Sequence, residues 1–387
     1  MKPSTYRSPR LGILGGGQLG RMLIQEAANL DIRVAVLDPD PEAPCARLCE
    51  RFVLGSFRDR DTVLSFGRTV DVLTVEIEHV NVDALETLEN EGVLVRPSSR
   101  ILRLVQDKGA QKIFYRTHGM PTAPFHLAAD RTEVEKHSGG LPFMQKLRTG
   151  GYDGKGVRPL KNISDLQEAF DAPSVLEKFV DLEKEISVIV ARRPGGETLT
   201  YPAVEMEFNP EANLVEFLFS PARIDRATEA KAEKLAAQIA DSLQLEGVLA
   251  VEMFLTKSGE LLINEIAPRP HNSGHATIEA NRTSQYEQHL RAVLDVPLGD
   301  TSLLQPSVMV NLLGEKGYDG EAAYVGMSEC LAIRGVHIHL YGKSTTKPFR
   351  KMGHVTVCDD SLDAAIEKAK TVQRTLKVIS TSEKTKS

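Results

Sequence analysis

The chain has 387 residues, 41% of them apolar and 26% charged, with a formal net charge of −6. This length suggests two or three domains, and the apolar content excludes disorder over most of the chain. The acidic balance argues against general nucleic-acid binding, which needs a basic surface. No apolar run is long enough to span a membrane, and four cysteines are too few for a disulfide framework, so we expect a cytoplasmic setting.

The first hundred residues alternate between short apolar strands and helices. We expect strands at 11–14, 32–37 and 70–75, and helices at 21–29 and 82–90. This alternation is typical of a mainly parallel sheet with helices on its faces. It predicts a Rossmann-like α/β domain over residues 1–104.

Two further regions follow, predicted at 105–302 and 303–387. The first is expected to be α+β, with an amphipathic helix at 228–243 and then strands at 248–255 and 261–267. The second is a small C-terminal domain ending in the polar tail STSEKTKS, at 380–387, which we expect to be disordered.

A glycine-rich turn follows the first predicted strand. Gly15, Gly17 and Gly20 have the spacing G-x-G-x-x-G, and Asp38 ends the next strand. This pattern suits dinucleotide binding, because glycines let backbone amides approach a phosphate. A plain strand-to-helix turn and a site for a small anion are alternatives.

A second glycine loop has the sequence GGYDGKG, at 150–156. With Lys146 and Lys155, its amides and ammonium groups could fold over nucleotide phosphates. It is not a Walker loop, because no Ser or Thr follows the lysine. An exposed hairpin is the alternative.

Two carboxylates are predicted to face each other across a hairpin. A turn centred on Ser258 and Gly259 places Glu252 opposite Glu265. Paired carboxylates repel unless a cation lies between them, so we expect magnesium bound to substrate phosphates there. An exposed polar hairpin face is the alternative. Strict alternation turns Asn264 away, so it joins the metal only through a local distortion.

Two further clusters of cationic and polar side chains are candidate anion-binding sites. The first lies in APRPHNSGH, at 267–275, where prolines and glycine impose an irregular backbone suited to an anion-binding loop. The second could hold a phosphate monoester or form a solvated charged loop. The first contains Arg269, His271, Asn272 and His275, and the second contains Lys343, Arg350 and Lys351.

Six motifs together resemble the N5-carboxyaminoimidazole ribonucleotide synthetase family of ATP-grasp enzymes, the ATPase subunit of phosphoribosylaminoimidazole carboxylase. They cover nearly the whole chain in the family's order, and the last two are the most specific. The motifs are GGGQLGRML, TVEIEHV, RTGGYDGKG, VLEKFV, NEIAPRPHNSGH and YGKSTTKPFRKMGHVTV.

The resemblance implies an ATP-grasp fold with a pre-ATP-grasp domain before it and a small C-terminal domain after it. It implies ATP- and bicarbonate-dependent carboxylation of 5-aminoimidazole ribonucleotide through carboxyphosphate, in purine synthesis, by a magnesium-dependent homodimer. Another ATP-grasp carboxylase or transformylase, an NAD-dependent oxidoreductase and a non-catalytic nucleotide-binding regulator are the alternatives.

The resemblance also implies the site residues. Magnesium would lie on Glu252, Glu265 and Asn264. Arg269, His271 and Asn272 would hold bicarbonate or carboxyphosphate, and Asp153 is a candidate base. The ribonucleotide would contact Gln18, Glu76, Tyr152 and Asp153, with its phosphate on Lys343, Arg350 and Lys351. ATP would contact Lys108, Lys146, Gly151, Tyr152, Asp153, Gly154, Lys155, Gly156, Val157, Glu177, Lys178, Phe179, Val180, Glu185, Asn264 and Glu265.

Overall fold

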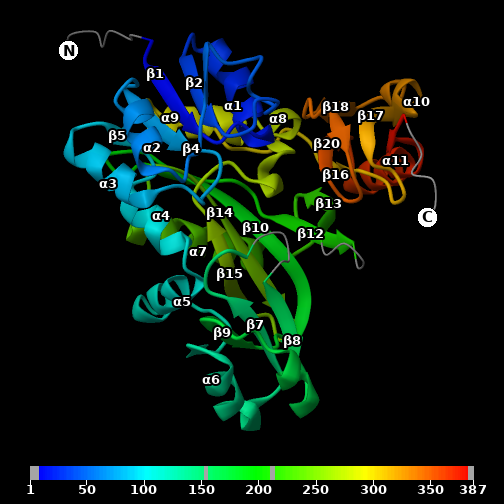
Figure 1. Cartoon of the computed structure of the whole chain (residues 1–387). Coiled ribbons are helices and arrows are strands. Elements are labelled where there is room, and N and C mark those ends of the chain that lie inside the picture. The colour runs from blue at the N-terminus through cyan, green and yellow to red at the C-terminus, as the bar shows by residue number, and fades with distance from the viewer. Residues whose placement is uncertain (1–7, 152–155, 210–213, 382–387) are drawn as a thin grey trace.

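A computed structural model describes residues 8–151, 156–209 and 214–381 of the chain. The N-terminal region, blue to cyan in Figure 1, contains a five-stranded parallel sheet in the order β3-β2-β1-β4-β5. Apolar side chains of α1 pack on one face of this sheet, and those of α2 and α3 pack on the other. Its central strands are short and apolar because both faces are covered. The predicted Rossmann-like fold is confirmed.

The elements of this region follow the predicted alternation, with several differences. Helix α1 begins at Gln18 rather than at residue 21, and the prediction lacks both the edge strand β3 and the helix α2 that follows it. The strands are β1 (Arg10–Leu14), β2 (Arg33–Asp38), β3 (Arg51–Leu54), β4 (Val72–Val75) and β5 (Leu94–Val95). The helices are α1 (Gln18–Asn29), α2 (Arg60–Gly67), α3 (Val82–Asn90) and α4 (Ser99–Val105).

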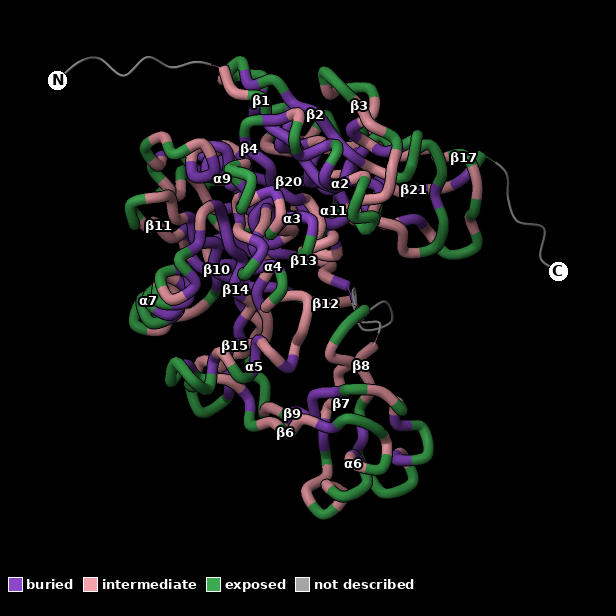
Figure 2. Tube along the Cα trace, turned by 60° about the vertical axis from the view of Figure 1, so that its left-hand side comes forward, coloured by how far each residue is buried: buried purple, intermediate pink, exposed green. Residues whose placement is uncertain are grey.

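A smaller lobe follows, at the bottom of Figure 1, built on a four-stranded antiparallel sheet in the order β6-β9-β7-β8. Figure 2 shows that its outer loops are largely exposed. Its core is a small apolar cluster around Phe143, Leu160 and Leu176. The elements are α5 (Lys108–Thr117), β6 (Phe125–Ala128), α6 (Arg131–Lys136), β7 (Phe143–Leu147), β8 (Val157–Leu160) and β9 (Ser174–Lys178), with 3-10 turns at Ser138–Gly140 and Ile163–Glu168.

The central sheet runs β15-β14-β10-β12-β13-β16-β20-β18, with β11 beside β10. Helix α7 covers β10, β14 and β15 through the alanine and leucine face that the sequence predicts. The elements are β10 (Leu182–Arg192), β11 (Thr198–Thr200), β12 (Val204–Asn209), β13 (Leu214–Ser220), α7 (Arg226–Leu243), β14 (Gly247–Thr256), β15 (Leu261–Ala267), η3 (Asn272–Gly274), α8 (Thr277–Ala280) and α9 (Gln285–Val293).

Strands β16, β20 and β18 of the C-terminal region continue this sheet, whereas β19, β17 and β21 form a separate three-stranded sheet. Strand β16 pairs antiparallel with β13, and Phe217 and Phe219 of β13 lie in the same core cluster as Val372 of α11. The predicted disordered tail begins too early, because Ser380 belongs to a strand. The elements are β16 (Ser307–Leu313), β17 (Gly320–Val325), α10 (Met327–Leu331), β18 (Val336–Leu340), β19 (Thr345–Thr346), β20 (Lys351–Cys358), α11 (Leu362–Thr375) and β21 (Lys377–Ser380).

Candidate active site

The hairpin of β14 and β15 carries the predicted carboxylate pair. Glu252 lies opposite Glu265, as predicted. The turn differs from the prediction, because Thr256 pairs with Glu260 and the three-residue loop between them holds Gly259 at φ +81°. Near the turn, the two strands are therefore paired one residue away from the predicted register. A β-bulge between the pairs Met253–Ile263 and Glu252–Glu265 then restores the predicted register.

The residue inserted by the bulge is Asn264. Ile263 and Ile266 on either side of the bulge are buried in the core under α7, so Asn264 and Glu265 both face away from that core. The Lys146 ammonium donates to Oδ1 of Asn264 at 2.9 Å. The local distortion that Asn264 needs to join Glu265 is thus present.

Three lysines and two glutamates line a small cavity beside this hairpin. Lys146 Nζ lies 2.9 Å from Oε2 of Glu177, Lys112 Nζ lies 3.1 Å from its Oε1, and Lys108 pairs with Glu265. The Glu177 side chain is only 4% exposed. Desolvation raises its pKa, but Lys146 and Lys112 outweigh this and lower it, so the carboxylate stays ionised. The cavity therefore offers ammonium groups to phosphates beside carboxylates for a cation.

The facing carboxylates have opposite electrostatic surroundings. Burial, together with Glu265 and Glu185, raises the pKa of Glu252. The pKa of Glu265 is lowered, because the positive charges of Lys108 and Lys146 outweigh the opposing effect of desolvation. Two carboxylates and an amide oxygen are hard ligands of the kind that magnesium prefers, so this donor set fits the ion.

The glycine loop approaches this cavity from the lobe. Val157, at the start of β8, lies opposite Lys146 on β7. A Cβ on Gly156, which has φ +77°, would lie 3.2 Å from the Cα of Gly151, so the two ends of the loop are close. The predictions for Tyr152, Asp153, Gly154 and Lys155 lie outside the described residues.

Five of the predicted ATP contacts lie on strand β9, on the connection to β10 and on β10 itself. Glu177 faces the cavity, whereas the neighbouring Lys178 turns away, donates to the carbonyl of Gly140 and lies over the ring of Phe143. Phe179 and Val180 follow as the connection, and the ring of Phe179 is 41% exposed. Burial raises the pKa of Glu185, on β10, to about 7. The side chain of Lys178 is therefore directed away from the site.

The loop after β15 contacts both the hairpin and the N-terminal region. Nη2 of Arg269 lies 2.8 Å from Oε1 of Glu78, which follows β4. Nε2 of His271 lies 3.5 Å from Oε1 of Glu252. Burial, reinforced by Arg269 and Lys351, lowers the pKa of His271 to about 3, so the imidazole is neutral.

Asn272 and His275 turn toward the C-terminal region. The side-chain amides of Asn272 and Asn311 exchange two hydrogen bonds, each 3.0 Å long. The buried ring of His275 lies 4.5 Å from that of His354, centroid to centroid, and its Nδ1 is 2.9 Å from the hydroxyl of Tyr286. Both side chains hold the loop in place, and contact of Asn272 with bicarbonate stays a prediction.

The glycine turn after β1 is built around protein carboxylates. Asp38 accepts hydrogen bonds from the amides of Gly16, at 2.6 Å, and Asp40, at 2.8 Å. A Cβ on Gly17 would lie 2.5 Å from Oε1 of Glu76. In dinucleotide-binding sites, an acidic side chain at this position binds a ribose hydroxyl. Here that side chain, Asp38, is already hydrogen-bonded to the glycine turn, which disfavours the NAD interpretation.

Gln18 begins α1 beside Glu76, the residue after β4. Burial raises the pKa of Glu76 to about 7, and the amide of Gly20 lies 3.4 Å from its Oε2. Parallel strands β1 and β4 are adjacent, so both residues lie at the carboxyl edge of the sheet, where ligands of such folds bind.

Lys343 and Arg350 lie on the segment that connects β18 to β20, and Lys351 is the first residue of β20. Lys343 donates to the backbone carbonyl of Lys351 at 2.7 Å, and Arg350 donates within the same segment at 2.8 Å. A Cβ on Gly342 would lie 3.2 Å from Nη1 of Arg21, on α1. This segment therefore lies against the helix that follows the glycine turn.

Two residues of the site were missed in the sequence. Lys112 lies one helical turn after Lys108 on α5 and shares its face, a spacing that could have revealed it. Glu78 lies two residues after Glu76, in the motif TVEIEHV, but its pairing with Arg269 depends on the fold.

Family comparisons agree with this architecture. A ribonucleotide synthetase preATP-grasp domain matches residues 9–106, an ATP-grasp domain matches 113–286, and a phosphoribosylaminoimidazole carboxylase C-terminal domain matches 307–368. The N5-carboxyaminoimidazole ribonucleotide synthase of Bacillus subtilis is 38% identical, over 95% of this chain and 96% of that protein. The chloroplastic phosphoribosylaminoimidazole carboxylase of Vigna aconitifolia is 41% identical, over 92% of this chain but only 65% of that protein.

Solved structures give the same result. The N5-carboxyaminoimidazole ribonucleotide synthetase of Thermotoga maritima is 44% identical, with a TM-score of 0.89 over 96% of this chain and 99% of that one. An Aspergillus clavatus N5-carboxyaminoimidazole synthase in complex with ADP and 5-aminoimidazole ribonucleotide is 36% identical, with a TM-score of 0.87 over 96% and 99% of the two chains.

The fold and the facing carboxylates define an ATP-grasp ligase. The three domain matches and the end-to-end similarity to the bacterial synthase specify it further. The chain belongs to the N5-carboxyaminoimidazole ribonucleotide synthase family, which confirms the resemblance of the six motifs. Among the described residues, no helix combines the length and apolar character needed to cross a membrane.

Proposed function

We propose that the chain catalyses ATP- and bicarbonate-dependent carboxylation of 5-aminoimidazole ribonucleotide to N5-carboxyaminoimidazole ribonucleotide, in purine synthesis. One observation carries the proposal. The loop after β15 contacts Glu252 through His271 and Glu78 through Arg269, so a single segment joins the carboxylate hairpin to the N-terminal region. A reaction that couples phosphoryl transfer to modification of a second substrate needs such a connection.

The nucleotide half of the proposed site is the lysine-lined cavity. Lys108 and Lys146 would neutralise phosphate charge, and Glu185 would bind the ribose hydroxyls. Glu252, Glu265 and Asn264 would hold magnesium. The ion, when bound, supplies charge neutralisation to the transferring phosphoryl group.

In the first step, a bicarbonate oxygen attacks the γ-phosphorus of ATP. The bond from that phosphorus to the β,γ-bridging oxygen breaks, and ADP leaves with the electron pair. Arg269 and His271 would hold the resulting carboxyphosphate by hydrogen bonds to its oxygens, and Asn272 is the third predicted contact. Enclosure of this intermediate away from water would protect it from hydrolysis.

In the second step, the amine of the ribonucleotide forms a bond to the carboxyl carbon, and phosphate leaves. Asp153 would take the proton that the amine loses. Gln18 and Glu76 would orient the imidazole, with Tyr152 and Asp153 beside it. Lys343, Arg350 and Lys351 would bind the 5′-phosphate, and their place against α1 supports this assignment.

Phosphate release from ATP tests the proposal, measured with and without bicarbonate and the ribonucleotide. We expect the full rate only when both are present. Bicarbonate-independent release, or equal release with another purine precursor, would favour a different ATP-grasp ligase. Binding of ATP without any release would favour the non-catalytic regulator.

We also propose that the enzyme is a cytoplasmic homodimer. The family resemblance supports the dimer, and the scarcity of cysteine supports a reducing compartment. Light scattering of the purified full chain checks the first. A mass near 42.5 kDa would contradict it, because that is the mass of one chain.

A further inference from the structure

Ser273 contacts the side of the His271 ring that faces away from the carboxylate pair. The Ser273 backbone N–H lies 3.3 Å from Nδ1 of His271, and its Oγ lies 2.9 Å from the same atom. A backbone N–H can only donate, so Nδ1 accepts and the ring proton lies on Nε2. Nε2 lies 3.5 Å from Oε1 of Glu252, so this N–H is directed toward the proposed reaction centre.

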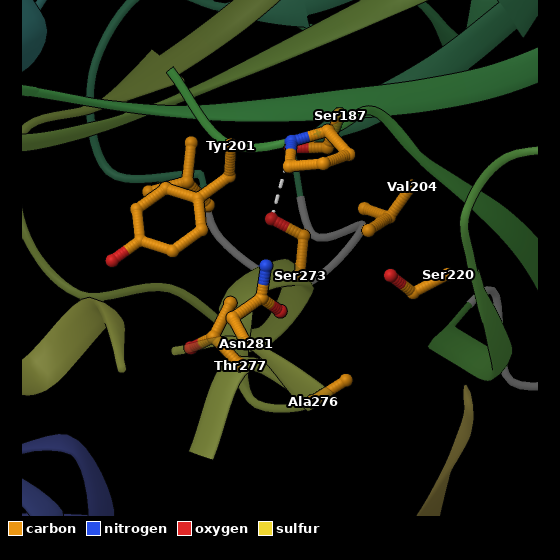
Figure 3. Close-up of a pocket in the computed structure, with 10 residues that line it drawn as sticks. Ser187, Tyr201, Val204, Ser220, Ser273, Ala276, Thr277 and Asn281 are labelled. Carbon is orange, nitrogen blue, oxygen red and sulfur yellow. Dashed lines mark hydrogen bonds between the residues drawn. The ribbon is translucent and has the colours of Figure 1, made fainter. Parts of the chain in front are cut away.

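A second serine supports the first. Oγ of Ser187, on β10, lies 2.8 Å from Oγ of Ser273, and Figure 3 shows this bond. Ser187 lies opposite Glu252 in the sheet. The two serines are 0% and 1% exposed, so solvent cannot replace either hydroxyl. The hydrogen bonds therefore run from Ser187 through Ser273 to His271.

The backbone of His271 is fixed as well. Its amide donates to Oε1 of Gln285 at 2.9 Å, and its carbonyl accepts from Nε2 of Gln285 at 2.7 Å. With both backbone groups held by one buried side chain, the remaining freedom of His271 is rotation of its ring. Ser273 restricts that rotation.

We propose that Ser273, supported by Ser187, is a positioning residue that keeps His271 as a neutral Nε2–H donor to the oxyanion bound beside Glu252. This inference rests on the proposed function, in which His271 contacts bicarbonate or carboxyphosphate. A ring in this tautomer donates to a developing negative charge. It cannot take a proton at Nε2, so His271 is not the general base.

Substitutions in one cavity test the role of the hydroxyl. Ser187, Ser220 and Ser273 line the same small cavity, and in Figure 3 the hydroxyl of Ser220 has no bond to the other two. We expect Ser273→Ala and Ser187→Ala to lower kcat about 10-fold or more, with KM for ATP nearly unchanged. Ser220→Ala is the matched control and should keep kcat. Equal losses in all three variants, or no loss in Ser273→Ala, would overturn the assignment.

Ser273→Thr tests whether restoring the hydroxyl restores the rate. Threonine keeps the hydroxyl group that contacts Nδ1 of His271, so we expect most of kcat to return. A threonine variant that folds, as judged by an unchanged thermal midpoint, but is as slow as the alanine variant would count against the hydroxyl.

Nitrogen chemical shifts test the tautomer directly. In protein labelled with ¹⁵N-histidine, the His271 signals are those that disappear in His271→Gln. We expect a protonated Nε2 and an unprotonated Nδ1, and the reverse pattern would refute the assignment. This measurement needs no turnover. If the enzyme releases no phosphate with bicarbonate and ribonucleotide, the proposed function is wrong. The spectrum would still determine the tautomer of His271.

A matched pair of variants tests which nitrogen acts. The amide nitrogen of glutamine can take the place of Nε2, whereas that of asparagine takes the place of Nδ1. We expect His271→Gln to keep at least about 10-fold more kcat than His271→Asn, as one properly placed donor warrants. If the asparagine variant is equally active, the donor is not on Nε2.

Discussion

The guanidinium of Arg269 lies 2.8 Å from the carboxylate of Glu78, and these side chains are only 17% and 13% exposed. The pair joins the loop after β15 to the segment after β4. Two residues before Glu78, Glu76 packs on the glycine turn, and two residues after Arg269, His271 approaches the carboxylate hairpin. One shielded ion pair thus sets the distance between the two halves of the proposed site.

Substitution of Glu78 tests that ion pair. Glu78→Gln keeps the size of the side chain but removes the charge opposite Arg269. We expect kcat to fall about 10- to 100-fold, because a small displacement of Arg269 misaligns the bound anion, with KM for ATP less affected. Phosphate release with all substrates measures this. Glu91→Gln, at an exposed pair with Arg68, is the control, and equal kcat in both variants would contradict the role of the pair.

The carboxylate hairpin gives the second prediction. Glu265→Gln removes one of two facing carboxylates and the partner of Lys108. We expect phosphate release to fall at least about 100-fold, because cation-dependent charge stabilisation is lost. Glu260→Gln, at the exposed turn of the same hairpin, should retain activity. Turnover by Glu265→Gln within a few-fold of wild type would refute the metal assignment.

The basic segment before β20 gives the third. Lys343→Ala should raise KM for the ribonucleotide about 10-fold or more, since a charged hydrogen bond to phosphate is lost, and should leave KM for ATP unchanged. Steady-state kinetics with each substrate varied in turn provide both values. Lys370→Ala, on the surface of α11, serves as the control. An unchanged KM for the ribonucleotide would reject the phosphate site.

The glycine turn allows a steric prediction. A Cβ on Gly17 would lie 2.5 Å from Oε1 of Glu76, closer than real contacts allow, so Gly17→Ala must displace that carboxylate. We expect a lower thermal midpoint and weaker ribonucleotide binding, with ATP binding retained. Gly139→Ala is the comparison, because a Cβ there would meet nothing within 4 Å. A Gly17→Ala enzyme that behaves like it would show that the contact is unimportant.

Glu76 itself predicts a pH dependence of stability. Burial raises its pKa from 4.5 to about 7, so between these values the native state binds more protons than the unfolded state and stability falls as pH rises. Glu76→Gln avoids the ionisation, which costs up to about 3 kcal/mol. We expect its thermal midpoint to exceed that of wild type by a few degrees at pH 8 and to match it below pH 4.5. Equal midpoints at pH 8 would contradict the shift.

The main architecture could be predicted because local patterns determine it. Alternating apolar runs gave the parallel sheet, and the hairpin placed Glu252 opposite Glu265. The bulge at Asn264 was not located, although Ile263 and Ile266 carry its signal. Two core residues three positions apart cannot share one face of a regular strand, and only the core under α7 shows that both are buried together.

Contacts between residues far apart in the chain could not be predicted from the sequence, for a different reason. The contacts of Lys112 with Glu177 and of Arg269 with Glu78 join elements whose spacing along the chain carries no periodic signal. The same holds for β13 and β16, whose alternation predicts two strands but not their adjacency.

The unbroken ladder from β15 to β18 has a mechanical consequence. The C-terminal segment cannot swing away on its own without breaking the backbone bonds between β13 and β16. The lobe of β6 to β9 has its own sheet, and it contacts the hairpin through Lys146 and Asn264. If one part of the chain moves when a nucleotide enters the cavity, we therefore expect it to be this lobe, while the central sheet keeps its shape.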